Sequence, residues 1–274
     1  MDETVGGPVA LTTARPEITH FFRLLADETR VRIVRLLSIT DLRAHEIGAA
    51  VQAPPSAVSY HLKQLRTLGL LRERRSAADA RDVYYHLALD RLTQLYTAGG
   101  DTLYPGLSTT PDANAHDHAQ PAEATSPPLR ILFLCTHNSA RSQLAEAIMR
   151  AMGSDQVEAF SAGSEPTEVA PEAIIVLRAL GLDSSRLVAK SLTTFIGQQF
   201  DYIITVCDRV RDVCPVFPGD PEQIHWSFAD PAVIEDPAQR LQAFREVAID
   251  LQTRIRYLLL LPHPRTGRRL RPHR

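Results

Sequence analysis

A loop bounded by a cysteine and an arginine follows a short apolar stretch in the second half of the chain. The stretch Arg130–Leu134 leads into the pattern Cys-x5-Arg-Ser, which runs from Cys135 to Ser142. Apolar residues then recur at helical spacing over Ser142–Met152. This order predicts a buried parallel strand, a tight loop and a helix, in which backbone N–H groups converge on an anion at the helix N-terminus. It restricts this half of the chain to an α/β fold with a parallel sheet.

The two ends of this loop carry groups suited to chemistry on an oxyanion. A cysteine at the head of an anion-binding loop has a stabilised thiolate, so we expect the pKa of Cys135 to be lowered. Arg141 closes the loop and can hold an oxyanion through two parallel hydrogen bonds. The other two of the three cysteines, Cys207 and Cys214, form a close pair further along the chain. One nucleophilic thiol and such a pair are what a disulfide relay needs, and inert core thiols are the alternative.

The whole chain has the composition of an ordinary soluble protein. Of its 274 residues, 44% are hydrophobic and 23% are charged. No apolar run approaches the roughly 18 to 20 residues that a membrane span needs, and the acidic start lacks the features of a signal peptide. Three cysteines do not suggest a secreted disulfide framework. We therefore expect a cytoplasmic protein with no membrane partner.

A polar, proline-rich stretch divides the chain into two parts. Between Gly99 and Pro128 the residues are mainly Ala, Pro, Thr, Asp and His, with no sustained apolar periodicity. Such a segment is too polar to bury a core and is typical of an interdomain linker. The arginines of residues 262–274 could touch nucleic acid, although a solvated terminus is the simpler interpretation. We predict a first domain at residues 1–100, a flexible linker at 101–128, a second domain at 129–261 and a basic tail at 262–274.

The first part of the chain is mainly helical by its apolar spacing, and two of its helices follow each other closely. We predict one at Ala44–Val51 and another at Ser56–Leu68, after a Pro-Pro pair. A basic segment at Leu70–Arg75, a polar turn and a segment at Val83–Leu87 then predict a β-hairpin. These are the parts of a winged helix-turn-helix. The alternative for the second helix is an amphipathic helix whose polar face is merely solvated.

Three strings in this region, Ala57–Leu62, Leu65–Leu71 and Asp27–Ile33, resemble the ArsR/SmtB family of winged-helix repressors. The resemblance implies a homodimer that binds double-stranded operator DNA. Polar residues of the second helix would approach base edges, and basic residues would meet phosphates. The residues placed at base edges are Ser56, Ser59 and Tyr60. Those placed at phosphates are Lys63, Arg66, Arg72, Arg74 and Arg75.

The predicted repressor domain and the linker contain no cysteine. Many arsenic sensors of this family bind As(III) through cysteines, because this soft centre prefers thiolate. Relatives that hold zinc use acidic and histidine residues on the last helix, and Leu92–Tyr96 contains no histidine. We therefore expect no metal site. Neither the inducing ligand of this domain nor its operator follows from the sequence.

The Cys-x5-Arg-Ser string is similar to the phosphate loop of the low-molecular-weight phosphotyrosine phosphatase fold, a resemblance that extends over Leu129–Leu261. Within that fold, Cys207-x6-Cys214-Pro215 followed by His225–Pro231 resembles the thioredoxin-coupled arsenate reductases. Phosphatases of the fold use the loop and the Asp-Pro pair but do not need the two later cysteines. The resemblance therefore implies a repressor fused to an arsenate reductase, which could also have a phosphotyrosine phosphatase side activity.

The same resemblance implies a mechanism. Arg141 and the loop amides bind arsenate, Cys135 attacks arsenic, and Asp230 protonates the leaving oxygen. Cys207 then attacks Cys135, and Cys214 moves the disulfide to the Cys207–Cys214 pair, which thioredoxin or a small-thiol system reduces without a bound cofactor. Asn138 braces the loop, and Ser142 hydrogen-bonds the Cys135 thiolate. The residues of the oxyanion-binding loop are Thr136, His137, Asn138, Ser139, Ala140 and Ser142.

Two other interpretations of the fusion stay open. One is a repressor joined to a protein-tyrosine phosphatase, and the other is a pure regulator whose second domain senses an oxyanion or arsenite. His137 stands where relatives often have glycine, and its effect on substrate choice does not follow from one sequence. Glu146 falls where some relatives coordinate a monovalent cation, but we expect a solvated helix glutamate. The physiological reductant and any communication between the domains also stay undetermined.

Overall fold

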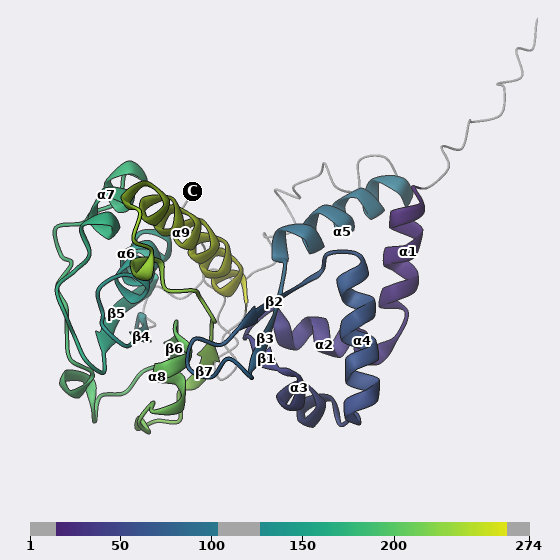
Figure 1. Ribbon diagram of the computed structural model, residues 1–274, viewed down its shortest axis with the longest axis horizontal. Coiled ribbons are helices and arrows are strands. Elements are labelled where there is room, and N and C mark those ends of the chain that lie inside the picture. The colour runs from purple at the N-terminus through teal and green to yellow at the C-terminus, as the bar shows by residue number, and fades with distance from the viewer. Residues whose placement is uncertain (1–14, 104–126, 262–274) are drawn as a thin grey trace, which may run out of the picture.

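Two domains lie side by side in the computed structural model, which describes residues 15–103 and 127–261 (Figure 1). The first domain combines helices with a small antiparallel sheet of strand order β1-β3-β2, which lies on the side of the second domain (Figure 1). Its elements are α1 (Pro16–Leu25), α2 (Glu28–Leu37), β1 (Leu42–Arg43), α3 (Ala44–Val51), α4 (Pro55–Thr67), β2 (Leu71–Arg75), β3 (Val83–Leu87) and α5 (Leu89–Leu103).

The helix-turn-helix consists of α3 and α4. The left-handed backbone of Gln52 (φ 57°) turns the chain after α3, and α4 begins at Pro55. Proline suits the first turn of a helix, because its missing N–H would have no partner there. Val58, Leu62 and Leu65 of α4 are buried against the domain core, so the polar face of the helix points outward. The predicted winged helix-turn-helix is confirmed.

The hairpin of β2 and β3, which we call the wing, has two different faces. Arg74 pairs with Tyr84 across the ladder, and Arg72 pairs with His86. Because neighbouring residues of a strand point to opposite faces, these four side chains share one face of the wing. That face packs against the second domain: the Tyr84 ring lies 4.8 Å from the ring of His225.

The second domain is an α/β domain with a four-stranded parallel sheet in the order β5-β4-β6-β7, as predicted. Its first elements are β4 (Leu129–Cys135), α6 (Arg141–Gly153), η1 (Ser154–Gln156), β5 (Val157–Gly163), α7 (Pro171–Ala179) and η2 (Leu192–Phe195). The remaining ones are β6 (Tyr202–Thr205), α8 (Asp208–Asp212), β7 (Glu222–His225), η3 (Pro231–Val233) and α9 (Pro237–Leu260).

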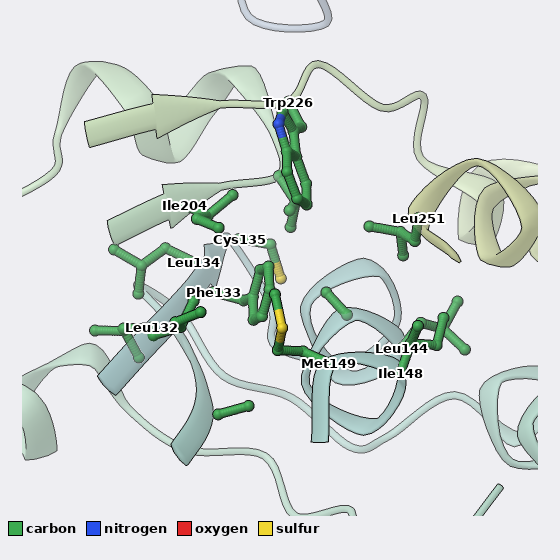
Figure 2. Close-up of a cluster of buried hydrophobic side chains, with 14 of the residues drawn as sticks. Leu132, Phe133, Leu134, Cys135, Leu144, Ile148, Met149, Ile204, Trp226 and Leu251 are labelled. Carbon is green, nitrogen blue, oxygen red and sulfur yellow. The ribbon is translucent and has the colours of Figure 1, made fainter. Parts of the chain in front are cut away.

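The core of the second domain lies around β4, which runs between β5 and β6. Leu132, Phe133 and Leu134 are fully buried, which explains why this strand is a continuous apolar run and not an alternating one. Figure 2 shows the β4 side chains near those of α6, with Leu251 of α9 on the far side of that helix. The sheet and α6 therefore hold the end of β4, where Cys135 lies, in a rigid setting.

The two domains meet through buried polar contacts. Asp41 N donates to His225 O at 2.7 Å, and the Asp41 carboxylate accepts from Ser227 N at 2.7 Å. The same carboxylate pairs with Arg254 of α9, at 2.8 Å and 3.1 Å. The Trp226 indole donates to Ile39 O at 2.9 Å. The first domain thus contacts the segment that follows β7.

Parts of the predicted linker and tail fall outside the described residues. Helix α5 continues through Leu103, so the first residues of the segment predicted as linker are helical. Residues 104–126 and the predicted basic tail at 262–274 are not described. Within the two described ranges, no helix combines the length and apolarity needed to cross a membrane.

Candidate active site

Cys135 is the last residue of β4, and the loop after it wraps around its thiol. Asn138 N donates to Cys135 Sγ at 3.1 Å, and the Ser142 hydroxyl lies 2.9 Å from the same sulfur. The backbone of Asn138 is left-handed (φ 47°), a conformation in which asparagine is enriched. Arg141 and Ser142 begin α6, so the free N–H groups of its first turn face the loop. This is the geometry of an anion-binding loop with a thiol at its base.

The carbonyl groups of the loop point away from the thiol. Thr136 O, His137 O and Ser139 O each accept a hydrogen bond of 2.9 Å, from the backbone N–H groups of Glu165, Thr167 and Ala170. These bonds hold the loop carbonyls on the outside of the loop, so that the backbone N–H groups of the loop can point inward toward an anion. The last loop residue, the buried Ala140, leads directly into α6.

Asn138 holds the loop from inside. Its Nδ2 donates to the hydroxyls of Ser142 (2.9 Å) and Ser161 (2.8 Å). Its Oδ1 accepts from Lys190 N (2.7 Å) and from Gln143 Nε2 (3.0 Å). The side chain is fully buried and all its polar atoms are paired. These contacts fit the bracing role predicted for Asn138, and Ser161, Gln143 and Lys190 are parts of the site that the sequence did not reveal.

Glu146 lies behind Ser161 and is buried, with 4% of its surface exposed. It accepts the Ser161 hydroxyl at 2.5 Å and Lys190 Nζ at 3.0 Å, and it also pairs with Arg150. Two cations offset the cost of taking its carboxylate out of water. The expectation of a solvated helix glutamate was therefore wrong, because α6 packs into the domain on this side as well.

Arg141 and Asp230 meet over the loop. Arg141 NH2 donates to Asp230 Oδ2 at 2.6 Å, and NH1 donates to Phe228 O at 3.0 Å. The guanidinium is buried, and its Nε has no hydrogen-bond partner among the described residues. Asp230 caps η3 by accepting from Ala232 N at 3.1 Å. The structure thus brings the predicted residues Arg141 and Asp230 together, and the Asp230 carboxylate contacts the guanidinium that would hold an oxyanion.

The ionisation of Cys135 differs from the sequence expectation. Burial raises the pKa of its thiol, and the Arg141 charge and the hydrogen bonds from Ser142 and Asn138 oppose this rise without cancelling it. The expected lowering is therefore not found in this structure. The neighbouring Cys207 acts in the same direction as burial, because a second negative charge close by disfavours the thiolate.

The two later cysteines lie at the ends of α8. Cys207 is buried beside the loop, with its sulfur 3.4 Å from Thr136 Oγ1. It occupies the N-cap position of α8 without a side-chain capping bond, and Cys214 follows the C-terminus. Burial raises the pKa of the half-buried Cys214 thiol to about 11. All three cysteines are free thiols, and the structure places Cys207 next to the nucleophile's loop.

Gly163, at the end of β5, allows the loop to come close. A Cβ on this residue would lie 2.5 Å from Thr136 O and 2.8 Å from Asn138 N. His137, by contrast, lies on the outer side, where its ring Nδ1 is 3.2 Å from Glu165 O. Sequence reasoning missed Gly163, although a glycine ending a strand often marks a close backbone approach.

The predicted DNA-binding residues fall into two groups. One group lies exposed along the outer face of α4, where Arg66 also pairs with Glu73 at 2.6 Å. Of the wing arginines, Arg72 and Arg75 are exposed. Arg74 is turned into the domain interface, where it contacts Asp208 and Ser227, and this removes it from a DNA-facing surface. Arg72 lies on the same face of the wing as Arg74 but is exposed. The exposed α4 group consists of Ser56, Ser59, Tyr60, Lys63 and Arg66.

Comparison with known families agrees with this division. Residues 130–262 match the low molecular weight phosphotyrosine protein phosphatase family. Residues 27–73 match the bacterial regulatory proteins of the arsR family. An arsenate reductase of Halalkalibacterium halodurans is 36% identical over 127 residues, which are 46% of this chain and 91% of that protein. One of Brevibacillus brevis is 36% identical over 126 residues, covering 46% of this chain and 90% of that protein.

The chain is also similar to solved structures. An arsenate reductase from Archaeoglobus fulgidus has 29% identity and a TM-score of 0.38, covering 46% of this chain and 98% of that one. A thioredoxin-dependent arsenate reductase from Corynebacterium glutamicum has 23% identity and a TM-score of 0.40, covering 78% of this chain and 92% of that one. The sequence relatives and the two family matches together assign both halves. The chain belongs to the low molecular weight phosphotyrosine protein phosphatase family, among its arsenate reductases, and joins that domain to an arsR-family regulatory domain.

Proposed function

We propose that the second domain reduces arsenate to arsenite and that the first binds operator DNA as a repressor. The observation that carries the enzymatic part is the order of three thiols along one path. Cys135 lies in the anion-binding loop, Cys207 borders that loop through Thr136, and Cys214 follows one short helix later. The arsenate reductases among the relatives support arsenate as the substrate.

Binding begins at Arg141. Arsenate takes the position of the Asp230 carboxylate on the guanidinium, and the buried Nε gives a second parallel hydrogen bond. The loop N–H groups of residues 136–141 hold the other oxygens. Asp230, once displaced, stays beside the anion and in its protonated form donates to the leaving oxygen.

The relay then passes two electrons to arsenic. The Cys135 thiolate attacks arsenic and one oxygen leaves as water. Cys207 attacks the Cys135 sulfur, and the electron pair of the broken S–As bond leaves with arsenite. Cys214 next attacks Cys207, which frees Cys135. A thioredoxin-like protein or a small thiol reduces the resulting Cys207–Cys214 disulfide, as suits a protein of the reducing cytoplasm.

The repressor part rests on the exposed face of α4. Small polar residues at its N-terminal end and Tyr60 suit base edges, while Lys63 and Arg66 suit phosphates. The match of residues 27–73 to the arsR family supports this use of the helix. Because half-sites are read by paired recognition helices, we propose that the protein acts as a homodimer on double-stranded DNA.

The enzymatic proposal is tested by arsenite production from arsenate, with thioredoxin, thioredoxin reductase and NADPH supplied. We expect Cys135→Ser to abolish arsenite production. We expect Cys214→Ser to release about one arsenite per chain and then stop, because the Cys135–Cys207 disulfide cannot pass on to a Cys207–Cys214 disulfide that a reductant reaches. Continued thioredoxin-dependent turnover in Cys214→Ser would contradict the relay.

A phosphatase is the second candidate, and one observation favours it. The loop, Cys135 and the Arg141–Asp230 pair are sufficient for phosphate ester hydrolysis without the later cysteines. Hydrolysis of p-nitrophenyl phosphate by the Cys207→Ser/Cys214→Ser double variant measures this activity alone. A rate comparable to arsenate reduction by the wild type would make the protein a phosphatase first.

A further inference from the structure

The wing of the first domain is docked on residues that adjoin Cys207. Arg74 forms an ion pair with Asp208, the residue directly after Cys207, and its Nε donates to Ser227 Oγ at 2.8 Å. Ala77 N, in the turn of the wing, also donates to Asp208, at 2.9 Å. Asp208 is 2% exposed, so the wing supplies part of the pairing that its buried carboxylate needs.

The charge on Asp208 depends on these partners. Burial acts to raise the pKa of this carboxyl, but hydrogen bonds from His225, Arg74 and Ala77 N hold it well below its ordinary value. Asp208 is therefore ionised, and it also accepts from the Ser227 hydroxyl at 2.7 Å. Separating the wing from Asp208 would leave a buried carboxylate with fewer donors, a costly change.

A second contact holds the other end of α8. Arg211 NH2 donates to Glu46 Oε1 of α3 at 2.7 Å. The Arg211 guanidinium also lies 5.2 Å from the centre of the Tyr84 ring on the wing. Both Asp208 and Arg211 belong to α8, the five-residue helix between the two later cysteines. The first domain thus contacts both ends of the helix that lies between Cys207 and Cys214.

This helix cannot persist when those cysteines are joined. Cys207 and Cys214 are seven positions apart. Helix α8 occupies Asp208–Asp212 of this stretch, and Cys207 before it is extended (φ −149°, ψ 150°); seven positions at the helical rise would span about 10 Å between Cα atoms. A disulfide tolerates a Cα separation of at most about 7 Å. Joining the cysteines therefore requires α8 to unwind, and unwinding moves the side chains of Asp208 and Arg211 that the first domain holds.

We propose that Arg74 and Arg211 are positioning residues for the cysteine pair, because they hold α8 in the form that keeps Cys207 and Cys214 apart. The wing is then docked on the second domain while the two thiols are free, and it is released when they form the disulfide. The proposal rests on the relay proposed above. Disulfide formation takes two electrons and two protons from the thiols. In that relay arsenic(V) receives the electrons while arsenate loses one oxygen as water.

The coupling must act in both directions. If docking favours the free thiols, then the free thiols favour docking by the same factor. Each turnover would therefore pass through a state with a released wing, until a reductant restores the thiols. The first domain would sense the redox state of the second without a cysteine of its own.

The test is a redox titration of the full chain carrying Cys135→Ser, in which Cys207 and Cys214 are the remaining cysteines. Dithiothreitol buffers of increasing oxidised fraction set the potential, and thiol labelling followed by mass spectrometry gives the midpoint. We expect Arg74→Ala and Arg211→Ala each to form the disulfide about tenfold more readily, a shift of about 30 mV for a two-electron couple. Arg81→Ala and Arg209→Ala are matched controls, on the wing turn and on α8, where both side chains are exposed.

The proposal would be overturned if the equilibrium constant for disulfide formation stayed within twofold of the parent value in both Arg74→Ala and Arg211→Ala. An equal shift in the controls would overturn it as well. A shift in either test variant, absent from both controls, supports it. Arg74→Lys, which keeps a cation beside Asp208, should restore a midpoint close to that of the parent. Because the titration contains no arsenate, a shifted midpoint together with failure of the wild-type chain to reduce arsenate would refute the proposed activity and leave the coupling standing.

Release of the wing has its own signal. Trp226 is the single tryptophan of the chain, is 2% exposed, and donates to Ile39 O across the interface. We expect its emission to move to longer wavelength when Cys207 and Cys214 are oxidised, and to stay unchanged in Cys207→Ser/Cys214→Ser treated alike. Identical emission of the reduced and oxidised protein would overturn release of the wing.

Discussion

Asn138 connects the reactive thiol to three separate parts of the second domain. Its backbone N–H contacts the Cys135 sulfur, while its side chain reaches α6, β5 and the segment before η2. It does this from a left-handed backbone conformation. Its role therefore has two physical components, the paired amide and the tolerated φ, and substitutions can separate them.

Replacing Asn138 by alanine or glycine distinguishes these components. Asn138→Ala leaves buried hydrogen-bonding groups unpaired and places alanine at positive φ, so we expect a loss of about 3 kcal/mol in unfolding free energy. Asn138→Gly loses the same bonds without the backbone strain, and it should be more stable than the alanine variant by about 1 kcal/mol. Urea denaturation measures both. Equal stability of the two variants would show that the backbone conformation is unstrained.

Two residues show where the sequence was insufficient at this scale. The pattern Cys-x5-Arg predicted the loop that carries Cys135 and Arg141, because the loop follows from local sequence. It did not predict the raised pKa of Cys135, which depends on burial of the thiol and on Cys207, a residue far along the chain. The buried setting of Glu146 likewise depends on Lys190, which no local pattern connects to it.

At the scale of elements, the helices and strands that carry the site were predictable within a residue or two. Strand β4, helix α6 and helix α4 follow from apolar periodicity and from proline at a helix start. The wing was predicted as a hairpin, but its arginines were all assigned to DNA. Strand alternation alone separates Arg74 from Arg75, and it could have indicated that one of them faces away.

The approach of β5 to the loop gives a prediction at this scale. In Gly163→Ala the new Cβ would lie 2.5 Å from Thr136 O, so the loop must move. A displacement near 1 Å can cost about a hundredfold in rate, and we expect a loss of that order in arsenite production. Gly181→Ala is the control: it has positive φ (71°) but no atom within 4 Å of its Cβ position. It should cost stability alone, and equal activity of the two variants would exclude a role for the close approach.

At the scale of the whole molecule, the two domains share polar contacts that neither half of the sequence predicts. Each half has its own apolar core, and those cores are what periodicity reveals. The contacts between Asp41 and Arg254, or between Arg74 and Asp208, join residues that are far apart in the chain. Their consequence is functional, since the wing that a repressor would place on DNA is here placed on the reductase.

This arrangement predicts which cations meet DNA. In the reduced protein Arg74 is held by Asp208, whereas Lys63 is exposed on α4. Each phosphate contact adds about one unit to the slope of log K against log salt for duplex DNA. Fluorescence anisotropy with a mixed-sequence duplex should show that Lys63→Ala lowers the slope by about one unit, while Arg74→Ala leaves it unchanged. After oxidation of Cys207 and Cys214, Arg74→Ala should lower the slope as well. A reduced protein in which both substitutions lower the slope equally would mean that the wing reaches DNA while the thiols are free, and that docking does not withhold it.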